Sequence, residues 1–199
     1  MRERKDWDKR YDENDLPWDS GRPDASLTNM LCRWPSCTGK ALEIGCGTGT
    51  NAVWLAEQGF EVTAMDISTS AIAIAEKRCA EKEVQCRLLA DDFLSCSLEA
   101  AQFDLIFDRG CFHSVNGEEE RRCFVRQAAS CLKAGGLWLS LMGNKDQVRE
   151  EKGPPRLSAT EICASVEPDF EILNLESILR DSARQPVQLR FWQCLMRLR

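Results

Sequence analysis

The amino-acid sequence predicts an α/β protein built on a doubly wound sheet of seven strands, mostly parallel, with helices on both faces. Three observations lead to this prediction. Short apolar runs alternate with helix-like segments through residues 40–143. A glycine-rich turn follows the first of these runs. Two further apolar runs close the chain with no helical pattern between them, which predicts an antiparallel strand at one edge of the sheet.

Seven segments have the length and the apolar content expected of strands. The first and the fourth are apolar enough to be buried in the middle of a parallel sheet. In chain order the predicted strands are 41–45 (ALEIG), 61–66 (EVTAMD), 84–90 (VQCRLLA), 103–108 (FDLIFD), 137–143 (LWLSLMG), 170–175 and 188–198 (QLRFWQCLMRL).

Four helices are predicted from apolar residues at helical spacing. The first spans 50–59, and the second spans 69–82 behind Ser68, a favourable N-cap residue. A short helix begins at Ser158. The clearest helix is 118–136, which has acids in its first turn and a glycine after its last. Its expected apolar face consists of Phe124, Val125, Ala128, Cys131 and Leu132.

The composition is ordinary for a soluble globular domain, with 43% hydrophobic and 29% charged residues. A net charge of −6 argues against nucleic acid or an anionic membrane as the main partner, because both attract basic surfaces. No apolar run is long enough to span a membrane, and the N-terminus lacks the apolar core of a secretory signal. We therefore expect one cytoplasmic domain, monomeric or weakly homodimeric. Its expected parts are a lid at 1–36, a cofactor-binding core at 40–142, and a substrate-side loop with terminal strands at 143–199.

The eleven cysteines are scattered singly, and no pair has the C-x-x-C spacing of a zinc site. Reduced cysteines that pack as small hydrophobic residues are the simplest explanation for most of them. The sequence therefore predicts no bound metal.

The stretch ALEIGCGTGT, residues 41–50, places glycines at alternate positions 45, 47 and 49. A dinucleotide-binding turn has the pattern G-x-G-x-x-G, and its third glycine would fall where this chain has Thr50. Glu43 precedes the turn, and a carboxylate is unfavourable beside a diphosphate. These features favour a ligand that carries positive charge and no phosphate.

S-adenosylmethionine is such a ligand, because it has an amino group, a sulfonium centre, a ribose and an adenine. Asp66 ends the second predicted strand, where an acid can accept hydrogen bonds from ribose hydroxyls. After the third strand, Asp92 can accept from the adenine amino group and Phe93 can cover the ring. Acids on three successive strands, together with the glycine turn, therefore predict an S-adenosylmethionine site.

The segment LEIGCGTGTNAVWLAEQGFEVTAMDIS resembles the cofactor motif of class I S-adenosylmethionine-dependent methyltransferases, which have a Rossmann-like sheet. WDKRY and PWDSGRPD before it, and FDRGCFHSV after the fourth strand, resemble the thiopurine/thiol methyltransferase and tellurite-resistance branch. The likeness covers most of residues 7–142. It implies that S-adenosylmethionine is the cofactor and S-adenosylhomocysteine the product, with Asp108 and Arg109 beside the methionine end. The implied cofactor contacts are Trp18, Glu43, Gly45, Cys46, Gly47, Thr48, Gly49, Asp66, Ile67, Asp92, Phe93, Asp108 and Arg109.

Methyl transfer is an in-line displacement from a good leaving group, so the protein chiefly aligns the partners and excludes water. A thiol of pKa ~8.5 is partly ionised near neutral pH and needs little help from a base. His113, the one histidine, follows the fourth strand on the acceptor side. We predict that it contacts the substrate or removes a proton, and the alternative is a structural histidine in a turn. Cys111 is expected to pack as a small residue, with a soft-metalloid contact as its alternative. The candidate acceptor contacts are Trp7, Tyr11, Cys111 and His113.

The lead-in segment 1–36 is polar yet contains Trp7, Trp18 and Trp34. We expect these indoles to form a lid that shields the cofactor and faces its sulfonium cation. The alternative is a helix pinned on the sheet edge. The charged loop 144–156, interrupted by prolines, suits a solvated connection or a flap over the substrate.

The sequence therefore predicts a methyltransferase for a small soft nucleophile, either a thiol or a selenium, tellurium or arsenic species. Two alternatives stay open. A nicotinamide-dependent oxidoreductase is opposed by Glu43 and by the absent third glycine. A non-catalytic S-adenosylmethionine-binding module is opposed by the presence of Glu43, Asp66 and Asp92 together.

Overall fold

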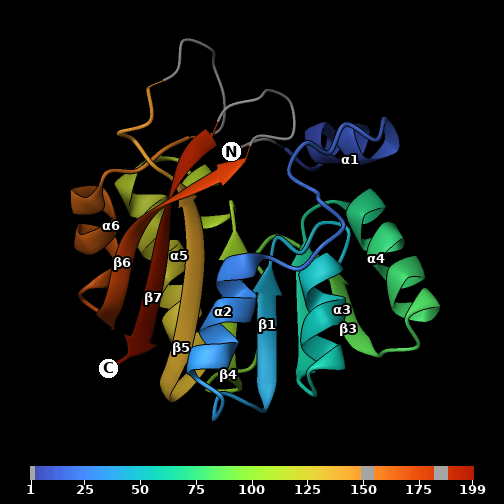
Figure 1. Ribbon diagram of the computed structural model, residues 1–199, viewed down its shortest axis with the longest axis horizontal. Coiled ribbons are helices and arrows are strands. Elements are labelled where there is room, and N and C mark those ends of the chain that lie inside the picture. The colour runs from blue at the N-terminus through green and yellow to red at the C-terminus, as the bar shows by residue number, and fades with distance from the viewer. Residues whose placement is uncertain (1–2, 149–154, 182–187) are drawn as a thin grey trace.

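The structure is a computed structural model and describes residues 3–148, 155–181 and 188–199. Its strands form one seven-stranded sheet in the order β3-β2-β1-β4-β5-β7-β6 (Figure 1). The first five strands of this order pair in parallel, and β7 is antiparallel to both of its neighbours. The predicted mixed sheet is thus confirmed. The strands are β1 (Lys40–Ile44), β2 (Glu61–Asp66), β3 (Cys86–Ala90), β4 (Phe103–Arg109), β5 (Leu132–Gly143), β6 (Phe170–Asp181) and β7 (Gln188–Leu198).

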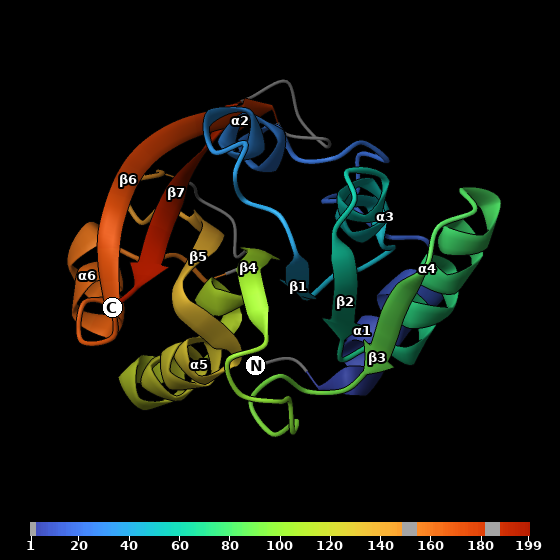
Figure 2. The same cartoon turned by 90° about the horizontal axis from the view of Figure 1, so that it is seen from below.

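Helices cover both faces of the sheet, as predicted (Figure 2). Helices α5 and α6 contribute buried side chains to the core on one face, and α2, α3 and α4 contribute to the core on the other. The described part of the chain contains no helix long and apolar enough to cross a membrane. The helices are α1 (Arg4–Asp12), α2 (Ala25–Arg33), α3 (Thr50–Glu57), α4 (Thr69–Glu81), the 3₁₀ turn η1 (Phe112–Ser114), α5 (Gly117–Cys131) and α6 (Ala159–Val166).

Local sequence signals account for several helix ends. Ser68 accepts a hydrogen bond from the backbone N–H of Ala71 through its side chain, which confirms the predicted N-cap of α4. Ser158 and Glu161 form a reciprocal capping box at the start of α6. Both signals are short-range, and both helices begin where the sequence predicts.

The helix predicted at 118–136 is wrong at its C-terminal end, because α5 ends at Cys131 and Leu132 already belongs to β5. The last helical carbonyls find partners outside the helix: Ala101 donates to Ser130 and Gln102 donates to Cys131, both at 2.8 Å. Those bonds satisfy the C-terminal carbonyls without a further helical turn.

Strand and helix do not alternate between β3 and β4, where the sequence predicts no helix. The described connection 91–102 contains turns but no helix. Leu94, Cys96 and Leu98 from this connection pack against the core on the α5 side of the sheet. A loop therefore covers part of the face that a helix would otherwise bury.

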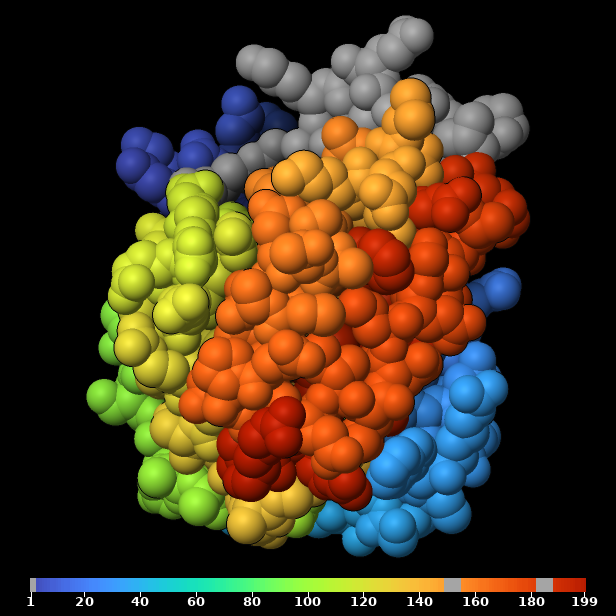
Figure 3. Space-filling model, turned by 90° about the vertical axis from the view of Figure 1, so that its left-hand side faces the viewer, coloured from blue at the N-terminus to red at the C-terminus, as the bar shows by residue number. Residues whose placement is uncertain are grey.

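The closing hairpin is longer than predicted, because β6 continues from the expected end at 175 to Asp181. This strand forms the outer edge of the sheet beyond β7. Figure 3 shows this side of the molecule, with the orange and red C-terminal elements lying between the yellow-green α5 and the lighter blue segment that contains α2. Of the predicted loop 144–156, residues 149–154 lie outside the described residues.

Candidate active site

A pocket of about 1540 Å³ lies at the carboxyl ends of the parallel strands. It lies above the upper ends of β1 and β4 in the view of Figure 1. These strands are neighbours, although β2 follows β1 along the chain, so the connections from β1 and β4 leave the sheet in opposite directions. A doubly wound sheet binds its ligands at such a switch point.

The glycine turn between β1 and α3 forms the floor of the pocket. Gly47 has φ 55°, and a Cβ added there would lie 3.0 Å from Tyr11 Oη. Gly49 has φ 78°, and a Cβ there would lie 2.8 Å from the Cβ of Ala75 on α4. Only glycine tolerates both the positive φ and the close approach. The turn therefore packs closely against Tyr11 on one side and against α4 on the other.

Glu43 lines the pocket from β1 and is almost fully buried. Its Oε1 accepts a hydrogen bond from Asn51 Nδ2 at 3.0 Å, whereas its Oε2 is buried with no hydrogen-bond partner among the described residues. Burial raises the pKa of this carboxyl to about 8. An orphaned carboxylate oxygen of this kind fits a cationic hydrogen-bond donor on a ligand.

Asp66 at the end of β2 holds the glycine turn in place. Its Oδ2 accepts from the backbone N–H of Gly47 and its Oδ1 from that of Ser68, both at 2.9 Å. Burial raises the pKa of Asp66, and these two backbone donors oppose the rise. Each carboxylate oxygen has a second lone pair, so Asp66 can still accept from two ligand hydroxyls.

The turn after β3 brings Asp92 and Phe93 to the same pocket. Asp92 Oδ1 accepts from the backbone N–H of Leu94 at 3.0 Å, which fixes the carboxylate at the rim. Phe93 is buried, and its ring lies 4.6 Å from that of Phe124 in the core. Phe93 thus lines the pocket from a rigid aromatic cluster.

The start of the lead-in segment lies over the glycine turn. Tyr11 is buried, and its ring and that of Trp7 pack edge-on against Trp18 at 6.0 and 5.7 Å. Arg10 lies over the Trp18 ring, 4.1 Å from its centre. Trp34 does not belong to this group, because it packs against the core cluster that contains α2. The lid expectation therefore fails for Trp34.

Asp24 ties the end of the lead-in to the sheet. Its carboxylate pairs with Arg109 Nε at 3.1 Å and with Arg180 Nη2 at 2.9 Å. Its backbone N–H donates to Asn51 Oδ1 at 2.8 Å, and Asn51 in turn donates to Glu43. Arg109 also donates to the carbonyl of Trp18 at 2.8 Å. We call Asp24 with these two arginines and Asn51 the Asp24 latch.

Every predicted cofactor and acceptor residue lines the pocket except Gly49 and Asp108. Asp108 is fully buried beneath it, where one oxygen accepts from Trp138 Nε1 and the other from the backbone N–H of Phe112, both at 3.0 Å. Burial raises the pKa of Asp108 to about 6. The expected cofactor contact is therefore wrong for Asp108, because its side chain is fully buried and does not reach the pocket.

The acceptor side of the pocket contains His113 and Cys111. His113 is buried, and its Nδ1 accepts a hydrogen bond from the backbone N–H of Gly143. A neutral imidazole has one acceptor nitrogen, so the proton of His113 is assigned to Nε2. Burial raises the pKa of the Cys111 thiol well above its ordinary value, and Asp108 adds to the shift. Cys111 is therefore a neutral thiol.

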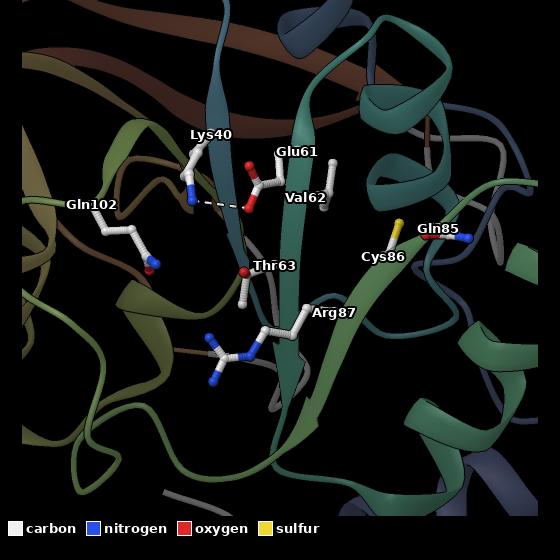
Figure 4. A pocket seen from close by; sticks show the side chains of 8 residues that line it. All are labelled: Lys40, Glu61, Val62, Thr63, Gln85, Cys86, Arg87 and Gln102. Atoms are coloured by element: carbon white, nitrogen blue, oxygen red, sulfur yellow. Dashed lines mark ion pairs between the residues drawn. The ribbon is translucent and has the colours of Figure 1, made fainter.

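A second hollow of about 280 Å³ lies at the opposite, amino ends of the strands, and Figure 4 shows its lining. Lys40 and Glu61, the first residues of β1 and β2, form an ion pair there at 2.9 Å. Neither the glycine turn nor the strand-end carboxylates reach it. Among the described residues, no cluster of His, Cys, Asp or Glu could hold a metal ion at either end.

Comparison with known proteins supports the predicted S-adenosylmethionine site. Residues 41–136 match the family model described as "Methyltransferase domain". A probable thiol methyltransferase 2 of Arabidopsis thaliana is 30% identical over 75% of this chain and 65% of its own length. Thiocyanate methyltransferase 1 of the same plant is 30% identical over 68% of this chain and 60% of its own length. The chain thus spans less than two thirds of either relative.

A solved structure with a similar fold is the 1,6-didemethyltoxoflavin-N1-methyltransferase of Burkholderia thailandensis. Its TM-score is 0.78 at 16% identity, with 98% of this chain and 86% of that chain covered. At this identity the likeness shows the fold alone. In sequence, the matched domain and the two plant relatives make the chain similar to S-adenosylmethionine-dependent methyltransferases of class I, and among them to the thiol methyltransferases.

Proposed function

We propose that this chain methylates the sulfur of a small thiol, with S-adenosylmethionine as the methyl donor. The assignment of the cofactor rests on Glu43, which lies beside the glycine turn. Its buried Oε2 has no hydrogen-bond partner among the described residues. The thiol half is supported by the names of the two plant relatives and by the chemistry of the acceptor side. Selenium, tellurium and arsenic nucleophiles are the alternatives within the same class of soft acceptors.

The residues present fit this cofactor. Glu43 would bind its amino group, Asp66 its ribose hydroxyls, and Asp92 with Phe93 its adenine. The aromatic group of Trp7, Tyr11 and Trp18 would close over it and exclude water. When bound, S-adenosylmethionine supplies a methyl group activated by a sulfonium centre.

The acceptor side offers no strong base among the described residues, which favours an acceptor that ionises easily. The lone pair of His113 is used by the Gly143 N–H, so the imidazole presents a donor and not a base. Burial keeps the pKa of Cys111 high, so Cys111 does not compete as a nucleophile. A thiol with an ordinary pKa of about 8.5 is ionised to a few per cent at pH 7 without help. The site then needs only to align the thiolate.

Calorimetry with S-adenosylmethionine, S-adenosylhomocysteine and NAD tests the cofactor assignment on the purified chain. Binding of both adenosyl compounds is expected, and binding of NAD alone would favour an oxidoreductase instead. A panel of thiols, selenite, tellurite and arsenite, scored for methylated products by mass spectrometry, tests the acceptor. Cofactor binding with no methylated product from any acceptor would favour a non-catalytic binding module.

A further inference from the structure

One wall of the acceptor side is apolar. Leu141 of β5, Ile178 of β6, and Leu189 and Phe191 of β7 all line the pocket. The sheet register makes them neighbours, because Phe191 pairs with Ile178 on one side and with Gly143 on the other. Since residues paired across adjacent strands point to the same face, these side chains form one continuous surface. We call these four residues the β5–β7–β6 wall.

The wall lies next to the predicted reaction centre. Gly143, which pairs with Phe191, is the residue whose N–H holds His113. Cys111 and His113 follow β4, the neighbour of β5, and line the same pocket. An acceptor bound between His113 and the predicted cofactor site can therefore extend along the wall without leaving the pocket.

The charged side chains beside the wall already have protein partners. Arg180 pairs with Asp24 at 2.9 Å and also donates to Ser26 Oγ. Asp181 accepts from Gln188 Nε2 at 3.2 Å. A charged tail on the acceptor would have to displace these bonds, whereas an apolar tail would cover Phe191 and Ile178 at no such cost.

We infer that the β5–β7–β6 wall receives the apolar body of the acceptor, so that the enzyme selects hydrophobic alkyl or aryl thiols over inorganic and charged ones. The inference rests on the proposed thiol methyltransferase activity and adds to it the class of thiol. Burying one methylene group is worth about a fourfold change in an equilibrium constant. Specificity should therefore rise steeply with chain length until the wall is covered.

The experiment compares kcat/KM, calculated from the concentration of thiolate at the assay pH, for hydrosulfide, ethanethiol, butanethiol and hexanethiol at saturating S-adenosylmethionine. Hydrosulfide is the soft nucleophile with no apolar part. For the unaltered chain we expect kcat/KM to rise about fourfold per methylene group, hence by roughly 100-fold or more from ethanethiol to hexanethiol. A charged thiol such as 2-mercaptoethanesulfonate should be at least tenfold poorer than butanethiol.

Phe191→Ala removes the centre of the wall and should reduce the ratio of hexanethiol to hydrosulfide specificity at least tenfold. The matched control is Leu179→Ala on β6. Leu179 neighbours Ile178 but does not line the pocket, and 53% of the residue is exposed. This control should keep the chain-length dependence of the unaltered protein. Phe191→Leu retains part of the apolar surface and should give an intermediate ratio. This variant provides the test if the alanine variant does not fold.

Two kinds of result would overturn different parts of the reasoning. Turnover of hydrosulfide and of all thiols with no dependence on chain length would refute the inference and leave the methyltransferase assignment intact. The inference also fails, with that assignment again intact, if Phe191→Ala and Leu179→Ala behave alike. Cofactor binding without turnover of any acceptor would instead refute the proposed function, and the inference with it.

Discussion

Replacing Glu43 by glutamine should stabilise the unliganded protein and weaken its binding of S-adenosylmethionine. The change keeps the shape of the side chain and an oxygen that can accept from Asn51. It removes a titratable group whose charged form is strongly disfavoured by burial in the pocket. Opposite effects on stability and on binding are expected. An unpaired buried carboxylate lowers the free energy of unfolding, whereas a carboxylate paired with the cationic amino group of the cofactor strengthens binding.

The size of the stability effect follows from the pKa of Glu43, which burial raises from its ordinary 4.5 to about 8. Below pH 4.5 the carboxyl is protonated in both the folded and the unfolded chain, so Glu43 does not reduce the free energy of unfolding there. As the pH rises towards 8, only the unfolded chain releases the proton, and the free energy of unfolding falls by about 1.4 kcal/mol per pH unit. At pH 7 this loss is about 3 kcal/mol.

Glutamine cannot ionise, so the variant should escape this loss. Urea unfolding of both unliganded proteins at about pH 5 and about pH 8 should give a stability difference that grows by about 3–4 kcal/mol between the two values. A difference that stays constant with pH would refute the assigned environment of Glu43. Calorimetry between about pH 5.5 and about pH 7.5 should show cofactor affinity rising about tenfold per pH unit in the unaltered protein only.

Substitutions at three further residues test neighbouring parts of the site. Asp66→Asn keeps an acceptor but loses the charge, and should weaken cofactor binding by about 1.5–3 kcal/mol; an unchanged dissociation constant would make Asp66 a strand-end residue only. Asn51→Asp removes the donor to Glu43 and adds a like charge beside it, so the pH at which S-adenosylmethionine binding becomes strong should move upward, whereas Asn51→Ala should not move it as far. His113→Asn should lower turnover by about tenfold or less with an unaltered pH–rate profile; a loss of about 10²–10⁴-fold together with a vanished acidic limb would identify a general base instead.

The cofactor side of the site was predictable because its signals are local. The glycine turn, Glu43 and Asp66 lie within one strand–helix–strand segment, and parallel strands bring their carboxyl ends together automatically. The structure places Glu43, Asp66 and Asp92 at one pocket, as expected. Their individual contacts with the cofactor stay predictions.

Asp108 shows where this reasoning stops. It lies one residue before the end of β4, and pleating sends it to the face that Trp138 occupies on β5. Arg109, one residue later, points to the other face and reaches Asp24. The choice between the two faces depends on the pairing register of β4 with β5, and that register has a bulge after Phe103. Nothing in the local sequence of β4 reveals it.

The Asp24 latch could not be foreseen at all. Asp24, Asn51 and Arg180 come from three separate segments, and none lies in a motif that suggests the others. Similarly, the end of α5 depends on donors from the 91–102 connection. Such contacts are set by tertiary packing, which overrides the helical pattern of the sequence.

The bond between Asp24 and Arg180 joins residues 156 positions apart. On the ribosome the chain emerges from its N-terminus, so β1, the glycine turn and β2 are available long before β6 exists. The nascent protein can therefore assemble the glycine turn with Glu43 and Asp66 early, while Asp24 still lacks both of its arginine partners. Because β7 lies between β5 and β6 in the sheet, the edge hairpin can dock only after β7 has been made. The apolar wall of the pocket is therefore completed after its carboxylate-lined floor, and a product truncated before β6 would have an open pocket.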